Sequence, residues 1–275
     1  MWIKKKDVEQ LSEFVKGYIA GEELDIRENK EGAFHILKND IYALVSKKNE
    51  EIKVLESERD TLSEYMADIS HQLKTPITSM MIMADLLEEA EPAKKEEFVH
   101  DIQISLNKME WLVGALLKMA KLDTHTISFQ KRDISTAELL EAVKPSIAIL
   151  LDIHNQQVDL KHDSIIYCDK RWTVEALTNI IKNAIEYSPN DSVITIDSGG
   201  NPMYSWISVK DCGPGLDKAS YASLFKRFEN STSENGYGIG MPLALSIVKG
   251  QGGDMDVDFG QDGQGTTFTM KFFSD

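Results

Sequence analysis

The sequence predicts an α+β protein in which a long helical hairpin precedes a smaller α/β domain. Apolar side chains recur in alternating steps of three and four at residues 41–90 and again at 98–119, the heptad pattern of packed helices. From about residue 127 the pattern changes to short segments of period two between helical ones. This change indicates a sheet covered by helices.

The first heptad repeat continues to residue 90 without a slip in register. At about 1.5 Å per residue, a helix of this length would be roughly 75 Å long. Lys48, Arg59 and Pro76 are untypical for such a seam. The seam consists of Ile41, Val45, Lys48, Ile52, Leu55, Arg59, Leu62, Met66, Ile69, Leu73, Pro76, Met80, Met83, Leu87 and Ala90.

A second helix is expected to fold back on the first. Residues 89–97 are predicted to form a turn, and Pro92 suits the first turn of the following helix. Two antiparallel amphipathic helices cannot bury both seams alone, so the pattern predicts a dimer that forms a four-helix bundle. The second seam consists of Phe98, Ile102, Ser105, Met109, Leu112, Leu116 and Met119.

Residues 1–40 are polar, and Gly17, Gly21 and Gly32 would interrupt a helix there, so a short linker or input segment is expected. The α/β part is expected to hold the following elements in order: a strand at 127–135, a helix at 136–151, strands at 157–162 and 164–168, a helix at 170–187, a hairpin of 192–198 and 203–211, a helix at 241–250, and a closing hairpin of 254–260 and 265–273.

Composition excludes some classes of function. A net charge of −15 argues against a nucleic-acid partner, whose phosphates need a basic face. Cys168 and Cys212 form no CxxC pair, which suits a reducing compartment without a zinc site. No apolar run reaches about 18 residues, so neither a transmembrane helix nor a signal peptide is expected. A cytoplasmic location follows, with membrane attachment only if a longer parent chain carries a span.

The stretch SHQLKTP (70–76) places a histidine just before a proline within the first heptad helix. With Ile69 and Leu73 on the seam, His71 takes the position furthest from the seam, and Thr75 follows one turn later on the same exposed side. A neutral imidazole offers a lone pair for attack. A lone exposed histidine is more often an ordinary surface residue, so this position alone does not decide the function.

SHQLKTP resembles the H box of sensor histidine kinases, and four further motifs of that family follow in order within residues 58–275. They are TNIIKNAIEYS (178–188, the N box), DCGPGLD (211–217, the first glycine box), SLFKRFENSTSENGYGIG (223–240, the F box and lid glycines) and GQGTTF (263–268, the last glycine box). The resemblance implies a linker or input segment with the start of the coiled coil at 1–57, a dimerisation and histidine phosphotransfer domain at 58–126, and a catalytic ATP-binding domain at 127–275, an α/β sandwich of the GHKL type.

Asn179 and Asn183 stand four residues apart, so both amides project from one helical face, which Glu175 extends by one turn. Amide oxygens bind a hard cation without adding charge. The resemblance implies that Asn183 holds Mg²⁺ beside the triphosphate of ATP.

The remaining motifs imply contacts with the other parts of the nucleotide. Asp211 would accept a hydrogen bond from the adenine amino group, and the lid is anchored by Phe225 and Phe228. Three alternate glycines open a helix whose N-terminal amides suit an anion. The other implied ATP-binding residues are Gly213, Gly215, Lys226, Arg227, Gly236, Gly238, Gly240 and Thr266.

The resemblance implies a dimeric, ATP-dependent protein-histidine kinase. His71 would attack the γ-phosphorus, and the phosphoryl group would pass to an aspartate in a response-regulator receiver domain. Thr75 would aim a water during dephosphorylation of that regulator. Gln72 stands where the family often has an acidic residue that takes the ring proton, and Glu186 where it often has a basic one.

Two alternatives stay open. Gln72 and Glu186 also fit an ATP-binding phosphatase or scaffold with weak kinase activity. A GHKL-type ATPase that switches the conformation of a dimer is the other alternative, although such a machine needs no exposed histidine on a heptad helix.

Overall fold

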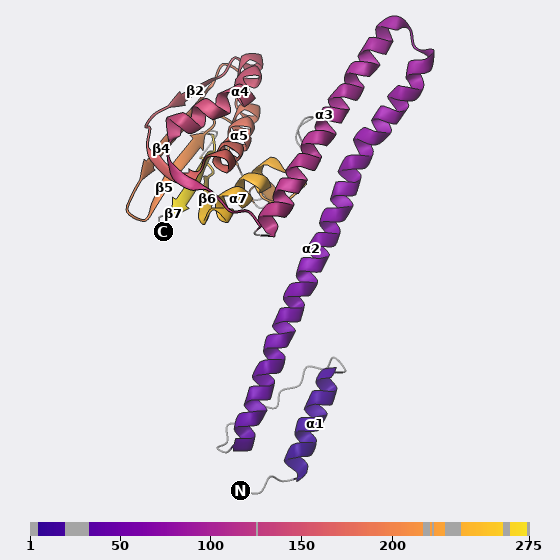
Figure 1. The fold of residues 1–275 in the computed structure, drawn as a ribbon, viewed down its shortest axis with the longest axis vertical. Helices are drawn as coiled ribbons and strands as arrows, with labels where there is room; N and C mark the ends of the chain where they lie inside the picture. Colours follow the sequence, from indigo (N-terminus) through magenta and orange to yellow (C-terminus); the bar gives the residue numbers. More distant parts are fainter. Residues whose placement is uncertain are drawn as a thin grey trace. The chain divides into compact units, whose positions relative to one another are not determined.

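The computed structural model describes residues 5–19, 33–124, 126–216, 221, 223–228, 238–260 and 265–273 (Figure 1). The chain divides into two compact units, Met1–Ile69 and Ser70–Asp275. No helix within the described ranges is long and apolar enough to cross a membrane. The elements are α1 (Lys5–Ile19), α2 (Ala33–Glu89), α3 (Pro92–Asp123), β1 (Lys131–Ser135), α4 (Thr136–His154), β2 (Gln157–Leu160), β3 (Ile165–Asp169), α5 (Lys170–Tyr187), β4 (Val193–Gly200), β5 (Tyr204–Lys210), α7 (Gly240–Gly250), β6 (Gly253–Asp258) and β7 (Thr267–Phe273).

In the first unit, α1 packs beside the start of α2. The side chain of Lys38 donates to Gln10 over 3.5 Å, and the ring centroids of Phe14 and Tyr42 are 6.2 Å apart. Each pair is 28 residues apart in the sequence, and a constant offset means that the two helices run parallel. Lys38 is 2% exposed, with its ammonium group 5.7 Å from the centre of the Phe34 ring.

The expectation that glycine would interrupt any helix within residues 1–40 was therefore wrong at Gly17. Leu11, Phe14 and Tyr18 recur at helical spacing, and Phe14 is 2% exposed. Burying this stripe against α2 outweighs the helix-weakening effect of Gly17, which lies inside α1. Gly21 and Gly32 lie outside the described residues.

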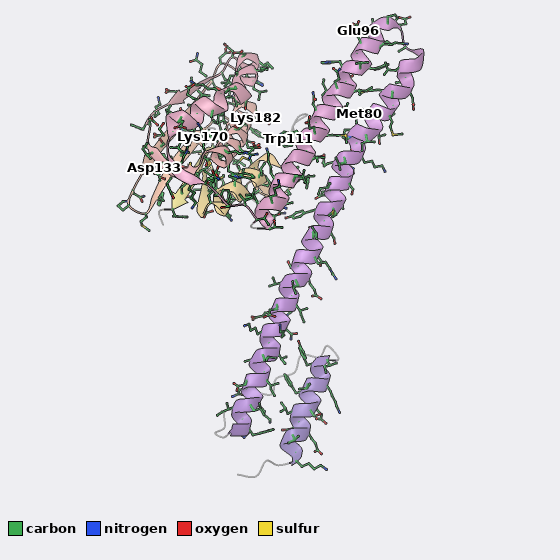
Figure 2. All side chains as sticks on the ribbon, in the orientation of Figure 1. Met80, Glu96, Trp111, Asp133, Lys170 and Lys182 are labelled. Atoms are coloured by element: carbon green, nitrogen blue, oxygen red, sulfur yellow. The ribbon has the colours of Figure 1, made fainter. Side chains whose placement is uncertain are left out.

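The predicted helical hairpin is confirmed. α2 continues through Pro76, and only residues 90 and 91 separate it from α3, so the turn is shorter than the expected 89–97. Pro92 is the first residue of α3, as its fixed φ favours. Met80, labelled in Figure 2, is half buried on the seam, whereas Met81 next to it is 63% exposed. The difference in exposure agrees with the heptad, which places Met80 on the seam and Met81 off it.

The α/β part contains a five-stranded sheet of order β2-β4-β5-β7-β6 and a separate β1–β3 pair. β2 runs parallel to β4, and all other neighbours are antiparallel. α5 packs between α4 and α7 and contacts β4 and β5. Both predicted hairpins are present, as β4–β5 and β6–β7.

The strand expected at 127–135 forms only from residue 131 onward. Before it, the N–H of Gln130 donates to the carboxylate of Asp169 over 2.8 Å, and Phe129 packs edge-on against Trp172. A side-chain acceptor and an aromatic contact therefore replace strand pairing in this segment.

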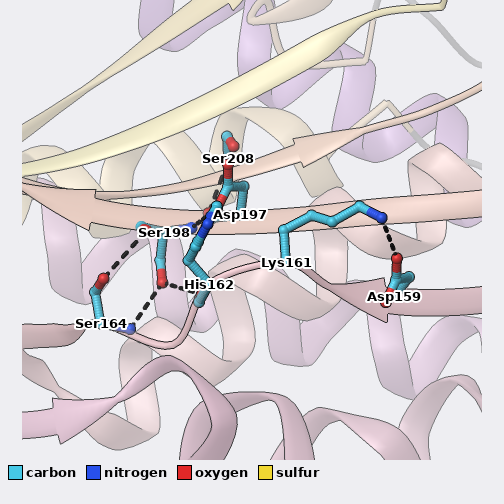
Figure 3. Close-up of polar contacts among 7 residues, drawn as sticks. All are labelled: Asp159, Lys161, His162, Ser164, Asp197, Ser198 and Ser208. Atoms are coloured by element: carbon cyan, nitrogen blue, oxygen red, sulfur yellow. Dashed lines mark hydrogen bonds and ion pairs between the residues drawn. The ribbon is translucent and has the colours of Figure 1, made fainter.

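The connection from β2 to β3 is fastened to β4 by a serine pair (Figure 3). Ser198, 3% exposed, donates through Oγ to the carbonyl of His162 over 2.7 Å and accepts from the N–H of Ser164 over 3.0 Å. Ser164 returns a bond to the Ser198 carbonyl, and His162 Nδ1 lies 2.8 Å from Asp197 Oδ1. These bonds fix where β3 starts, and therefore where α5 begins.

Asp169 joins three segments at the start of α5 and is 8% exposed. Its Oδ1 accepts from the N–H of Trp172 over 3.2 Å, which caps the helix, and its Oδ2 accepts from Gln130. Its own N–H donates to Oε1 of Gln251 over 2.7 Å. One carboxylate therefore fixes the N-terminus of α5.

We expect Asp169→Ala to lower the free energy of unfolding by about 2 kcal/mol, because a helix cap is lost and the partly buried N–H of Gln130 loses its acceptor. Asp169→Asn keeps one acceptor oxygen and should lose about half as much. Urea unfolding followed by tryptophan fluorescence measures both. An alanine variant as stable as the wild type would contradict this role.

Candidate functional site

His71 lies on α2 with its side chain exposed. The hydroxyl of Thr75 donates to the His71 carbonyl over 3.3 Å, and Pro76 has no N–H to give to the carbonyl of Gln72. Within the described ranges, no side chain is hydrogen-bonded to the imidazole. The ring is therefore accessible to a second reactant, as its heptad position predicted.

Glu175, Asn179 and Asn183 lie along one face of α5 and are all half buried. Asn179 donates through Nδ2 to the carbonyl of Glu175 over 2.9 Å. A Cβ on Gly240 would lie 3.1 Å from Asn179 Oδ1, so this amide touches the first residue of α7. The structure thus brings the amide face of α5 to the N-terminus of α7, where a helix attracts anions.

Asp211 follows β5 and is 3% exposed. Its Oδ1 accepts from the N–H groups of Gly213 and Thr266, over 2.8 and 2.9 Å. Burial raises the pKa of this carboxyl above its ordinary value, and the two backbone bonds oppose that rise. In the described part of the chain, Oδ2 has no hydrogen-bond partner, which leaves it available to a ligand.

The glycines around Asp211 permit close backbone contacts. A Cβ on Gly213 would lie 2.7 Å from the Tyr187 carbonyl, and Gly215 has φ +85° with a Cβ position 2.9 Å from the Phe259 carbonyl. Gly265 has φ +79°, and a Cβ there would collide with the Asp211 carbonyl. Sequence reasoning named Thr266 but not Gly265. Its position between Gln264 and Thr266 in the last glycine box is the sequence feature that could have indicated it.

Phe228 is the last described residue at the start of the lid motif. It is 8% exposed and has φ +68°, and its N–H donates to the Gly238 carbonyl over 3.1 Å. Phe225 is half buried, with its ring edge-on to Tyr221 at 5.8 Å. Gly238 has φ +64°, and Gly236 lies outside the described residues. Phe228 therefore fastens one side of the lid to the other.

Arg227 and Glu175 both form ion pairs with α3. The guanidinium of Arg227 donates to both carboxylate oxygens of Asp123 at 2.9 Å, and its side chain is 20% exposed. Lys118 Nζ lies 2.8 Å from Oε1 of Glu175. Both bonds come from one guanidinium nitrogen, so a phosphate at this position would compete with Asp123 for the positive charge of Arg227. Lys226 is exposed. Sequence reasoning missed Lys118 and Asp123, because a heptad gives no information on which surface charges meet a second domain.

Two family models match the chain. Residues 61–125 match the His Kinase A (phospho-acceptor) domain, and residues 168–275 match the histidine kinase-, DNA gyrase B- and HSP90-like ATPase. His71 lies within the first match, and Asn179, Asn183 and Asp211 lie within the second.

Curated relatives match about three quarters of the chain. Sensor histidine kinase WalK of Bacillus subtilis (strain 168) is 29% identical over 219 residues, covering 75% of this chain and 36% of WalK. Sporulation kinase C of the same organism is 30% identical over 213 residues, covering 76% and 48%. This chain thus spans between about a third and a half of the length of these relatives.

Solved structures share the fold. Histidine kinase AdeS of Acinetobacter baumannii superimposes with a TM-score of 0.60 at 22% identity, covering 74% of this chain and 97% of AdeS. Histidine kinase ThkA, in a crystal structure with the response regulator protein TrrA, gives a TM-score of 0.64 at 18% identity, covering 83% and 66%.

We expect Asp123→Asn to strengthen ATP binding by roughly two- to fivefold, because the carboxylate that competes with the phosphates for Arg227 is removed. The magnitude follows from the value of a partly exposed ion pair, about 0.2–1 kcal/mol. Asp123→Glu keeps the charge and serves as the matched control. Calorimetric titration of both variants with ATP gives the comparison. An unchanged or weaker affinity of Asp123→Asn would remove Arg227 from the phosphate site.

Proposed function

Because the chain belongs to the sensor histidine kinase family, we propose that it is an ATP-dependent protein-histidine kinase. It phosphorylates His71 and transfers the phosphoryl group to an aspartate of a response regulator. The observation that carries this proposal is an exposed imidazole on a phospho-acceptor helix, followed in the same chain by an ATPase fold with the buried carboxylate Asp211. The domain division at 1–57, 58–126 and 127–275 is part of the proposal.

Adenine recognition is assigned to Asp211. Oδ2, which the described residues leave without a partner, accepts a hydrogen bond from the exocyclic amino group. Guanine presents a carbonyl oxygen at that position, so two acceptors would face each other. Gly213, Gly215 and Thr266 hold the carboxylate loop in the shape that admits the base.

The triphosphate is assigned to the region between α5 and the start of α7. Gly238 and Gly240 would present backbone amides to the phosphates, and the lid motif adds Gly236, which lies outside the described residues. Lys226 and Arg227 would add positive charge. Asn183 is the residue that would hold Mg²⁺, since amide oxygens suit this cation. Bound there, Mg²⁺ would offset negative charge on the phosphates. Asn179 and Glu175 extend the same oxygen-bearing face.

The phosphoryl transfer uses the lone pair of one imidazole nitrogen. A nitrogen–phosphorus bond forms as the bond from the γ-phosphorus to its bridging oxygen breaks, and ADP leaves with that oxygen. The second ring nitrogen carries the proton that the product must lose. During the reaction Gln72 would accept a hydrogen bond from that N–H and orient the ring, but an amide cannot take the proton. Positioning therefore contributes more to this reaction than general-base catalysis.

We also propose that the chain acts as a homodimer. Leu55, Leu62 and Met66 of the α2 seam are 62%, 56% and 59% exposed in the single chain. An apolar seam of this length is stable in water only when another helix covers it. The response regulator would dock on the resulting bundle near His71, where the Thr75 hydroxyl could aim a water at the aspartyl phosphate. The proposed reaction places the chain in the cytoplasm, where ATP is available.

The phosphatase or scaffold function remains the second candidate, because Gln72 and Glu186 replace groups that would support the kinase reaction. It predicts ATP binding and regulator dephosphorylation with little labelling of His71. The conformational-switch alternative is disfavoured, because it gives the exposed imidazole no role.

His71→Ala tests the main proposal. Incubation of the wild type with γ-labelled ATP should give a label that is lost in acid and survives base. The variant should lose the label but bind ATP with an affinity within about twofold of the wild type, because the imidazole makes no contact with the nucleotide site. His100→Ala, an exposed histidine on α3, is the control and should label normally. Label retained by His71→Ala would overturn the assignment of the nucleophile.

Asp211 predicts a pH dependence. Its pKa is raised by burial, so protonation begins at a higher pH than for an ordinary carboxyl. As the pH falls through this raised pKa, the nucleotide-free protein gains stability, because a desolvated charge is removed, while ATP affinity falls, because Oδ2 no longer accepts.

Asp211→Asn should weaken ATP binding by about 1.5–3 kcal/mol and abolish this acid-side loss of affinity. Titrations with ATP at several pH values measure both effects. The same acid profile in the variant would assign the pH dependence to another group.

A further inference from the structure

We infer that Gln156 is a positioning residue for the adenine-binding loop and acts on it through the C-terminal end of α5. Gln156 follows α4 and lies outside the motifs that predicted the nucleotide site. The inference rests on the proposed role of Asp211 in binding adenine.

The side-chain amide nitrogen of Gln156 is hydrogen-bonded to three backbone carbonyls. Gln156 is 5% exposed, and its Nε2 donates toward the carbonyls of Ile185, Ser188 and Pro189 at 3.1, 3.1 and 2.9 Å. Its Oε1 is buried without a hydrogen-bond partner among the described residues. Rotating the amide by half a turn would place Oε1 against the three carbonyls, so the donors fix its orientation. The site therefore uses the N–H groups and tolerates an unpaired oxygen.

The backbone before Gln156 is fixed. Asn155 caps α4 in the left-handed region with φ 48°, and the N–H of Gln156 donates to the carbonyl of Leu151 over 2.9 Å. The N–H of Asp191 donates to the His154 carbonyl over 3.1 Å. Gln156 is thus held by a rigid helix end, and its side chain transmits that position to the turn between α5 and β4.

The same turn supports the adenine loop. The N–H of Cys212 donates to the hydroxyl of Ser188 over 3.0 Å, and the Cα of Gly213 comes so close to the Tyr187 carbonyl that a Cβ would lie 2.7 Å from it. Gly213 in turn donates its N–H to Oδ1 of Asp211. A continuous path of contacts therefore leads from Gln156 through Ser188 to the carboxylate that is assigned to the base.

Loss of the Gln156 amide should affect binding of the adenine base and not of the phosphates. Gln156 contacts neither the amide face of α5 nor the start of α7, to which the phosphates are assigned. Loss of its amide leaves the carbonyls of Ile185 and Ser188 without a donor, while the Pro189 carbonyl keeps its bond from the Ser192 hydroxyl. The turn can then shift, and the Asp211 loop shifts with it. We therefore expect the adenine contact to weaken while the phosphate contacts remain.

The experiment compares variants of the full chain in calorimetric titrations with ATP, GTP and inorganic tripolyphosphate. Gln156→Leu should bind ATP about tenfold more weakly, while its affinities for GTP and tripolyphosphate stay within twofold, so the preference for ATP over GTP collapses. Ser188→Ala, which removes one buried hydroxyl from the same path, should act in the same direction and tests the path if Gln156→Leu folds poorly.

Two comparisons separate positioning from loss of stability. Gln251 is an equally buried amide that bonds to Asp169 and Thr173, so Gln251→Leu should lower the melting temperature without changing the preference for ATP over GTP. The double variant Gln156→Leu/Ser188→Ala should bind ATP no more weakly than the weaker single variant, because both substitutions interrupt one path.

Equal weakening of ATP and tripolyphosphate binding, or full additivity of the two substitutions, would overturn the inference. A wild-type ATP preference that persists in both single variants would do the same. Failure of the wild type to bind ATP at all would instead contradict the proposed nucleotide site itself, and these outcomes are distinguishable in one set of titrations.

Discussion

The fixed position of α5 is the constraint on which the candidate site depends. Asp169 caps its first turn and Gln156 holds the carbonyls at its last turn, so side chains from outside the helix determine both ends. Between these ends, Asn179 and Asn183 lie on a helix that packs against α4, α7 and the sheet. A nucleotide site that must hold a base and a triphosphate in one fixed geometry requires such a rigid support.

The hairpin obeys a different constraint. α2 buries its seam only where α3 or another helix lies against it, so its exposed face is free for a reacting group. In the proposed reaction His71 uses that freedom: its helix position needs no pocket, and the ATPase part supplies the reactant. The two parts would then divide the chemistry, one offering the nucleophile and the other the phosphoryl donor.

The sequence was informative wherever a local period or a local turn decides the structure. The heptad predicted the hairpin and the exposure of His71, and period two predicted both β-hairpins. α1 was not predicted, because Gly17 lowers helix propensity and the apolar stripe of Leu11, Phe14 and Tyr18 is short. Lys118, Asp123 and Gln156 could not be predicted, because their partners are 28 or more residues away in sequence and no local pattern encodes such contacts. Gly265 lay within a predicted motif, but the collision that requires glycine becomes visible only beside Asp211.

The ion pair between Arg227 and Asp123 has a thermodynamic consequence. If the guanidinium must leave the carboxylate of Asp123 to reach a phosphate of the nucleotide, the two bonds exclude each other. Thermodynamic linkage then makes the effect reciprocal. If docking of α3 lowers the affinity for the nucleotide by some factor, binding of the nucleotide lowers the equilibrium constant for docking of α3 by the same factor. Any influence that pulls the C-terminal turn of α3 away would thus raise nucleotide occupancy without touching the site, and filling the site would in turn release the hairpin.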